Sequence, residues 1–355
     1  MTYIRPEPVA PVMGSLLKPP PMRFFYTVSR GSWAVLYRSE RRNDNLLRSG
    51  WRSSFDRVWV RKLVRGGSVP VPASALFAVS NSSAVPSPWV VAGAVVGLPL
   101  ALWAYKCLMM VLFQRKIIYM GNAGNPLHRI PKFRLLAGKL IVDNLEREVQ
   151  VIAVAPRSYW TSTKTSPSEA GFLSDYTAVL EWISNAYPNS PVVLYGHSIG
   201  GSIAVKLLAS LPASTRVRGL VVENAFTSVP AMVRTVYPSK WLPYYHLGPL
   251  VFDKWDALST LSHERSSALR NVILHPPSIL IINSENDELV PAEMGREMFD
   301  AASFVYHGLS KPLGTGPRRV LIPGALHDDA FTKRQWKDEM RAYLTKVATV
   351  DTYRQ

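Results

Sequence analysis

Cysteine is nearly absent from this sequence, and its histidines do not follow metal-binding spacings. Cys107 is the single cysteine among 355 residues, which excludes an intrachain disulfide framework and a cysteine zinc site. The seven histidines include no HExxH pair, the spacing with which two histidines on one helix face hold zinc. We therefore expect neither a bound metal nor a metal-dependent enzyme.

Charge is also scarce, and it is unevenly placed. Charged residues make up 19% of the chain and apolar residues 47%, which is typical of a chain with a substantial core. The net charge is nevertheless +16, and residues 1–88 hold 13 Lys or Arg against 4 Asp or Glu. No recognisable nucleic-acid-binding module accompanies this basic segment, so we expect no nucleic-acid partner.

The N-terminal segment, residues 1–88, has little periodicity. Residues 1–75 are rich in Pro, Gly and Ser, and we predict mostly disorder there, with one short helix around 54–65. Residues 66–88 contain no charge and many Pro and Ser, which indicates a linker. An Arg-rich, Ser-rich, acid-poor segment is also typical of a transit peptide, and this stays an alternative.

The longest apolar run is "WVVAGAVVGLPLALWAYKCLMMVLF", residues 89–113. At about 1.5 Å per residue, a helix of this length exceeds the roughly 30 Å hydrocarbon core of a bilayer. The run shows no polar face, unlike the helices of most soluble domains. It predicts a single transmembrane helix in an endomembrane or the plasma membrane, and the alternative is a buried core helix.

The charges beside this run indicate an orientation. No Lys or Arg occurs in the 20 residues before it, while Arg115 and Lys116 follow it closely. By the positive-inside rule, the C-terminal domain then faces the cytosol. The distant basic residues of the N-terminal segment favour the opposite orientation.

Residues 114–355 alternate strand-like and helix-like stretches. Short apolar runs predict strands at 150–155, 192–195, 218–222, 278–282 and 319–322. Helix-like segments lie between and after them, at about 170–186, 199–210, 292–302 and 329–347. Continuous apolar strands that alternate with helices predict an α/β fold, with a mainly parallel sheet covered by helices on both faces.

The stretch "VVLYGHSIGGSIA" carries the main chemical signal. Gly196, Ser198 and Gly200 form a G-x-S-x-G pattern between a strand and a helix. In a nucleophile elbow the serine sits on a sharp turn, and the two glycines let the backbone pack closely. The backbone N–H of Ile199, at the helix start, is placed to bind a developing oxyanion. The alternative is that Ser198 is only a turn residue.

A serine nucleophile needs a base and an orienting carboxylate. After the strand at 278–282, the sequence "ENDELVP" offers Glu285, Asp287 and Glu288. After the strand at 319–322, "ALHDDAF" offers His327. The order Ser, acid, His along the chain is the one that this kind of sheet uses. His197, inside the elbow, is interpreted as a packing residue.

The motifs "GHSIGGSIA", "VVENAFTSVPAMV", "NDELVP" and "GALHDDAF" together resemble the α/β-hydrolase superfamily. The resemblance is closest to its membrane-anchored group, the serine aminopeptidase-like hydrolases. It implies a triad of Ser198, Asp287 and His327, because the acid of that group heads a D-x-x-V-P stretch. It also implies a second oxyanion donor, the backbone N–H of Asn122, because "GNAGN" resembles the family's HGNAGN segment. The family's histidine there is Met120.

One departure from the family stands out. The family places its first two strands between the anchor and a third strand that leads into HGNAGN. Here "FQRKIIYM" runs directly into "GNAGN". Two early strands are therefore missing, and "KIIYM" serves either as the end of the anchor or as the third strand.

The resemblance implies a membrane-anchored serine hydrolase that cleaves esters or thioesters of small acyl or lipid-like substrates through an acyl-enzyme, without metal or cofactor. The domains would be a basic segment 1–88, a membrane helix 89–113 and a hydrolase domain 114–355. Within the last, residues 228–275 form a helical cap or, alternatively, a long surface insertion. The alternative functions are a membrane-tethered pseudoenzyme and a peptidase.

Overall fold

The computed structural model describes most of the chain after residue 87. The described residues are 87–120, 129–142, 145–159, 162–212, 215–262, 276–307 and 316–352, together with the backbone of 25–29 and 32–34. The chain divides into two units, one of Met1–Leu36 with Ala104–Gln355 and the other of Tyr37–Trp103. The first unit contains all the candidate site residues.

A four-stranded parallel sheet forms the centre of the first unit. Its strands are β6 (Val192–His197), β7 (Val217–Glu223), β8 (Ser278–Ser284) and β9 (Arg318–Ile322), paired in that order. Every side chain of β8 is buried, as expected for a strand covered on both faces. These are four of the five strands that the apolar runs predict, and β5 (Val151–Val154) is the fifth.

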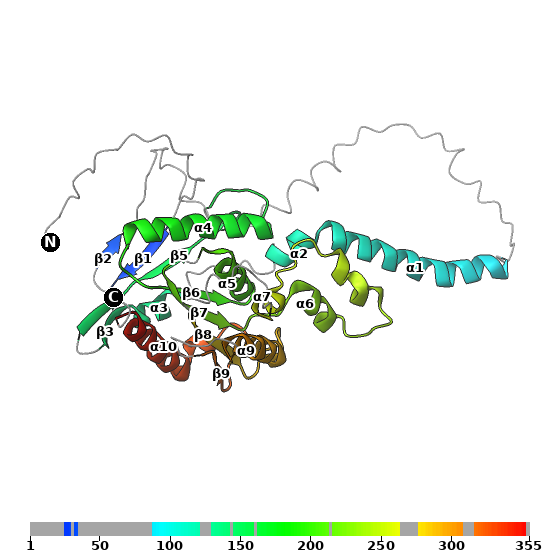
Figure 1. The fold of residues 1–355 in the computed structure, drawn as a ribbon. Helices are drawn as coiled ribbons and strands as arrows, with labels where there is room; N and C mark the ends of the chain where they lie inside the picture. The colour runs from blue at the N-terminus through cyan, green and yellow to red at the C-terminus, as the bar shows by residue number, and fades with distance from the viewer. Residues whose placement is uncertain are drawn as a thin grey trace, which may run out of the picture. The chain divides into compact units, whose positions relative to one another are not determined.

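Helices cover both faces of this sheet, as the alternating side chains of the strands require. Leu220, Val222 and Ile281 point into a core cluster with α4 (Glu169–Ala186), α5 (Ile199–Ser210) and α9 (Ala292–His307). The opposite faces, with Val221 and Leu280, pack against α10 (Arg334–Thr352) and α3 (Ile130–Leu136). Figure 1 shows α4 and α10 on opposite sides of the strands. The predicted α/β architecture is confirmed.

The strands that precede β6 are arranged in a way that the sequence does not predict. β5 pairs antiparallel with β1 (Phe25–Ser29), which pairs in turn with β2 (Ser32–Ala34). The sequence predicts mostly disorder over 1–75 and does not predict these two strands, and the other residues of that range lie outside the described residues. β1 and β5 are more than 120 residues apart, and such a pairing depends on a free strand edge rather than on local pattern. The helix predicted around 54–65 lies outside the described residues.

A second hairpin, β3 (Gly138–Val142) with β4 (Leu145–Val149), stands apart from both sheets. Among the described residues, β6 pairs with β7 only, so no strand lies between β5 and β6. The family's third strand would occupy that place. No described residue fills it, whereas the strands that the sequence indicates to be missing are the first and the second.

The segment "KIIYM" is helical. Helix α1 (Pro88–Leu112) is followed after a short break by α2 (Gln114–Met120), so this segment ends the anchor and is not a third strand. Its Tyr119 is buried against Phe172 and Trp255, a tertiary contact that holds the helix. Helix α1 is long and apolar enough to cross a membrane, and none of its side chains is buried. This does not favour the alternative of a core helix.

The segment predicted as a cap is helical where it is described. It contains α6 (Val229–Val236), the 3-10 helix η3 (Pro243–Leu250) and α7 (Ala257–Ser262), all between β7 and β8. Ser228 caps α6 by accepting a hydrogen bond from the backbone N–H of Ala231, a common helix start signal. Residues 263–275 of the predicted cap lie outside the described residues.

Candidate active site

Ser198 lies between β6 and α5 in a strained backbone conformation. Its φ is 54° and its ψ is −125°, and a non-glycine residue held at positive φ costs about 1–3 kcal/mol. Its N–H donates to the Glu223 carbonyl at 2.8 Å, and its own carbonyl accepts from the N–H of Gly201 at 2.9 Å. These bonds fix the turn between the end of the strand and the start of the helix, which is the geometry of a nucleophile elbow.

The glycines around Ser198 have unequal roles. A Cβ on Gly196 would lie 2.1 Å from the carbonyl oxygen of Gly200, and one on Gly201 would lie 2.5 Å from the Cβ of Ala225. A Cβ on Gly200 would meet nothing within 4 Å. Close packing therefore requires glycine at positions 196 and 201. The sequence pattern predicts this role for Gly196 and Gly200, and misses Gly201.

His327 and Asp287 form a close pair in the loops after β9 and β8. His327 Nδ1 lies 2.8 Å from Asp287 Oδ2 and 3.0 Å from Oδ1, and both side chains are 4% exposed. Because a carboxylate only accepts, Nδ1 carries the hydrogen, and the neutral ring then has its lone pair on Nε2. This is the tautomer that a general base needs in a Ser-His-Asp arrangement.

Asp287 is held in its charged form. Its Oδ1 accepts hydrogen bonds from the N–H groups of Leu289 at 2.9 Å and Val290 at 2.7 Å. Burial by itself raises the pKa of Asp287, but the hydrogen bonds from His327 and from these two amides outweigh it, and the pKa is lowered. The carboxylate thus stays ionised to a lower pH than a free aspartate.

The other two acids of the same loop hold the backbone that carries His327. Glu288 accepts a hydrogen bond from the His327 N–H at 3.0 Å, and Glu285 accepts one from the Gly324 N–H at 2.8 Å. The resemblance favours Asp287 over both as the acid of the triad. The hydrogen bonds of Glu285 and Glu288 instead hold the backbone of the His327 loop. All three acidic side chains of "ENDE" thus contact the loop that carries His327.

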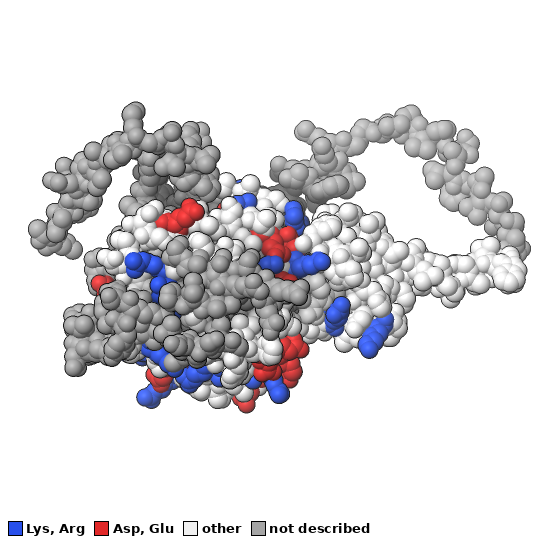
Figure 2. All heavy atoms as spheres, in the orientation of Figure 1, with Lys and Arg blue, Asp and Glu red and all other residues white. Residues whose placement is uncertain are grey.

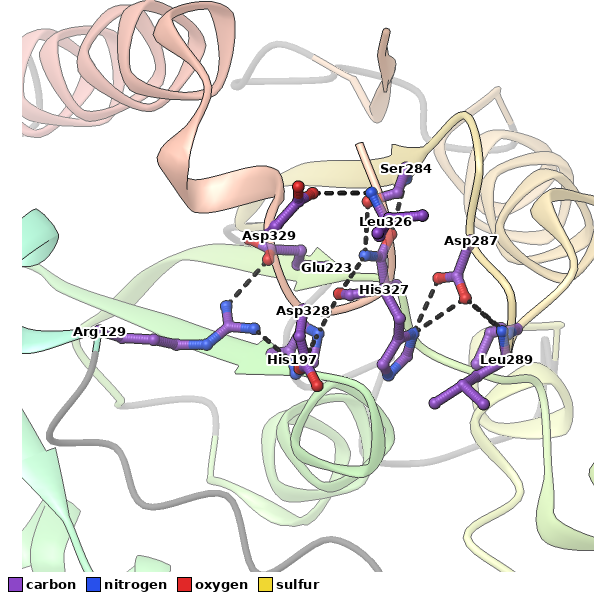
Figure 3. A network of polar contacts seen from close by, with 12 residues as sticks. Arg129, His197, Glu223, Ser284, Asp287, Leu289, Leu326, His327, Asp328 and Asp329 are labelled. Carbon is purple, nitrogen blue, oxygen red and sulfur yellow. Dashed lines mark hydrogen bonds and ion pairs between the residues drawn. The ribbon is translucent and has the colours of Figure 1, made fainter. Parts of the chain in front are cut away.

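His197 contacts this loop directly and is more than a packing residue. Its Nε2 donates to the carbonyl of His327 at 2.8 Å, and the centres of the two imidazole rings are 4.7 Å apart. Asn224, at the end of β7, donates to the same carbonyl at 2.8 Å. The elbow, the end of β7 and the His327 loop therefore meet at the carboxyl edge of the sheet. Figure 3 shows His327 between Asp287 on one side and His197 on the other.

The pKa of His197 is lowered from 6.5 to about 4. Burial is the largest cause, and the cationic Arg129 adds to it, against an opposing effect of Glu223. His197 is therefore neutral near pH 7. No sequence motif indicates that His197 bonds the His327 loop, because the residue before the serine of an elbow can be of many types.

A buried ion pair joins Arg129 to Glu223, whose carbonyl accepts the N–H of Ser198. Arg129 donates from Nη1 to Glu223 Oε1 and to the hydroxyl of Tyr195, both at 2.9 Å. Glu223 Oε2 accepts from Tyr195 at 2.7 Å and from the indole N–H of Trp336 at 2.6 Å. Arg129 Nη2 also lies 3.5 Å from Asp328, the residue after His327. The sequence alone does not single out this network.

One group within the described ranges has the composition of a metal site. Ligand atoms of His197, His327 and Asp328 lie within 4.8 Å of one another. Each of these residues already has a protein partner, since His197 Nε2 donates to a carbonyl, His327 Nδ1 donates to Asp287 and Arg129 contacts Asp328. We assign no metal to this group. Asn122, the other predicted oxyanion donor, lies outside the described residues.

The sequence of the chain is similar to those of several known proteins. A family model described as serine aminopeptidase, S33, matches residues 162–251. Protein bem46 of Schizosaccharomyces pombe is 30% identical over 178 residues, covering 49% of this chain and 52% of that protein. Lysophosphatidylserine lipase ABHD12 of Gallus gallus is 31% identical over 147 residues, covering 41% and 37%. The chain thus spans about half or less of these relatives.

Among solved structures, the esterase Pf2001 of Pyrococcus furiosus aligns with a TM-score of 0.39 and 16% identity, covering 56% of this chain and 70% of the esterase. A monoacylglycerol lipase of Paleococcus ferrophilus aligns with a TM-score of 0.35 and 14% identity, covering 58% and 84%.

Proposed function

Since the chain belongs to the α/β-hydrolase superfamily, we propose that it is a membrane-anchored serine hydrolase that cleaves carboxylic esters or thioesters of lipid-like substrates. The observation that carries the proposal is the junction between the elbow and the His327 loop. The residue before Ser198 donates to the backbone of His327, whose ring is oriented by Asp287. The relatives named as lysophosphatidylserine lipase make a lysophospholipid the first substrate to assay.

The proposed reaction is acyl transfer to water. His327 Nε2 takes the proton of the Ser198 hydroxyl while its Oγ attacks the carbonyl carbon, and Asp287 stabilises the imidazolium. The N–H of Ile199, at the first position of α5, has no partner within the helix and faces the oxyanion. The second donor is the backbone N–H of Asn122. His327 returns the proton to the leaving alcohol or thiol, and a water molecule then releases the acyl group by the reverse steps.

A fluorophosphonate probe tests this proposal on the full chain in detergent micelles. We expect covalent labelling of the protein, its loss in Ser198→Ala, and its retention in Ser210→Ala, a control at the end of the same helix whose hydroxyl bonds the carbonyl of Leu207. A wild-type protein that melts cooperatively but is not labelled would refute the proposal. It would instead support the pseudoenzyme, which is favoured by the lack of a strand between β5 and β6 in the part of the chain that the structure describes.

Peptidase activity is a second candidate because the matching family model is described as a serine aminopeptidase. Purified protein assayed side by side on long-chain acyl esters and on aminoacyl amides separates the two. We expect turnover of the esters, and turnover of the amides alone would assign the peptidase.

We also propose that α1 is the single membrane span, with the domain after it in the cytosol. The positive charges Arg115 and Lys116 directly after α1 support this orientation. The sequon at Asn81 lies on the other side of α1. A glycan that disappears in Asn81→Gln, together with protease access to a C-terminal tag, is the expected result. Protection of the tag in sealed vesicles would contradict this orientation.

A further inference from the structure

The helices between β7 and β8 expose large apolar side chains. We call residues 228–252, which hold α6 and η3, the cap segment. Trp241 is 72% exposed and Phe252 66%, and Val236 and Leu250 are exposed as well. Such a gathering of exposed apolar groups on one short segment marks an interaction surface rather than ordinary scatter.

The cap segment is fixed against the C-terminal end of the anchor helix. Gln114 donates to the Leu250 carbonyl at 3.1 Å and accepts from the Phe252 N–H at 2.7 Å. Arg115 pairs with the buried Asp253 at 3.0 Å. Leu250 and Phe252 at the end of the cap segment therefore lie beside the C-terminal end of the anchor helix, whose exposed apolar side chains include Leu108, Leu112 and Phe113.

A contact of Lys106 shows where along the anchor helix η3 lies. Its Nζ lies 4.8 Å from the ring centre of Tyr244 in η3. Lys106 stands seven residues before the end of the apolar run at Phe113, a distance of about 10 Å along a helix. If α1 crosses a bilayer, η3 lies beside it at the boundary between headgroups and acyl chains, the depth at which interfacial helices lie.

The charge of this surface is of one sign. The cap segment and residues 104–120 contain Lys106, Arg115, Lys116, Arg234 and Lys240, and no Asp or Glu. In Figure 2 the surface over α6 and η3 is white and blue, without red. An apolar surface with basic residues and no carboxylates fits the interface of a bilayer that contains anionic phospholipids.

We propose that the cap segment is a second membrane-binding element, which inserts Trp241 and Phe252 into the leaflet beside α1 and binds anionic phospholipid headgroups. This inference rests on the proposed membrane span. The same elements reach the candidate site, because Val229 and Val251 of the cap segment pack in one cluster with Val290, whose N–H holds Asp287. A lipid-like substrate then reaches the site from the leaflet rather than from water.

Depth-dependent quenching tests the insertion on the full chain. In a Cys107→Ser background, Trp241→Cys and Phe252→Cys are each labelled with an environment-sensitive fluorophore and reconstituted into vesicles of zwitterionic and anionic phospholipid. The matched control is Phe304→Cys on α9, which is 64% exposed and stands four residues after Asp300. We expect blue-shifted emission and quenching by spin-labelled acyl chains at positions 241 and 252, and neither effect at 304.

Water-like, unquenched emission at both cap positions would overturn the inference. Energy transfer between labelled copies without lipid quenching would also overturn it and would assign the surface to a second copy of the chain. Quenching that is equal in purely zwitterionic vesicles would overturn the part that concerns anionic headgroups.

A kinetic readout separates this inference from the proposed function. We expect the double variant Trp241→Ser/Phe252→Ser to lose about tenfold or more of its activity on a vesicle-borne long-chain ester, because two apolar rings no longer hold the cap in the leaflet. Its activity on a water-soluble short-chain ester and its fluorophosphonate labelling remain. If the wild type shows no activity or labelling, the proposed function fails, while the quenching experiment still decides the insertion.

Discussion

The pairing of Arg129 with Glu223 makes the sharpest prediction about stability. Glu223 is fully buried, and the Arg129 side chain is 11% exposed. Replacing Arg129 with methionine keeps most of its length but leaves the carboxylate of Glu223 without its cation. Hydrogen bonds from Tyr195 and Trp336 remain, so the charge keeps partners but loses its counter-ion.

The expected magnitude follows from these contacts. Breaking a buried ion pair by removing one partner costs about 3–5 kcal/mol of unfolding free energy. We place Arg129→Met near the lower value, about 3 kcal/mol, because two of the four hydrogen bonds to Glu223 and its neighbour survive. Adding Glu223→Gln removes the unpaired charge while keeping an acceptor. The double variant is therefore expected to recover most of the loss.

Chemical denaturation of the full chain in detergent micelles, followed by tryptophan fluorescence, measures these free energies. The control is Arg318→Met, because Arg318 pairs with Glu339 at 2.8 Å but is 55% exposed, and surface pairs contribute about 0–1 kcal/mol. Equal losses in Arg129→Met and the control would refute the reasoning. So would a double variant that is no more stable than Arg129→Met.

Three further predictions concern the elbow and the pair behind it. Gly196→Ala is expected to lower the melting temperature strongly and to abolish probe labelling, because its Cβ would lie 2.1 Å from a backbone oxygen. Gly200→Ala is expected to leave both nearly unchanged, since a Cβ there meets nothing within 4 Å. Comparable losses in the two variants would contradict this. The pKa of His197 is about 4 in the folded protein, against the usual value of 6.5. As the pH falls, the unfolded chain therefore binds the proton first, and the unfolding free energy should drop by at most about 3 kcal/mol between pH 6.5 and pH 4. His197→Gln should remove that part of the pH dependence, and identical free-energy profiles from pH 7 to pH 4 would count against it. Asp287→Asn is expected to reduce ester turnover about 10³–10⁴-fold with the fold retained, because an amide does not hold the imidazole in the same tautomer; turnover within tenfold of the wild type would show that Asp287 is not the acid.

Several features of the protein are already determined by its sequence. Strand and helix periods depend on neighbouring residues, so the predicted strands and helices of residues 150–347 agree in type and approximate position with those of the structure. The elbow is also local, because Ser198 needs only a strand before it and a helix after it. The parallel sheet then brings the loops after β8 and β9 to the same edge, which is why the sequence alone predicts that Asp287 and His327 lie together.

Tertiary structure decided the features that depend on distant partners. "KIIYM" is apolar enough for a strand or a helix, and the burial of Tyr119 against Phe172 and Trp255 accompanies the helix. The resemblance favours Asp287 as the acid, but it does not indicate what Glu285 and Glu288 do. The fold places Asp287 against the His327 ring, Glu288 against the His327 N–H and Glu285 against the Gly324 N–H.

His197 and the cap segment show the same dependence. A histidine next to the elbow serine gains its function only when the His327 carbonyl comes within hydrogen-bonding distance. The sequence predicts a helical cap or a surface insertion over 228–275, but only the packing of α6 and η3 decides that Trp241 and Phe252 are exposed. Local pattern determines which elements form, because the backbone repeats with a short period. Which side chains meet depends on how those elements pack, since that brings together residues that no local pattern relates.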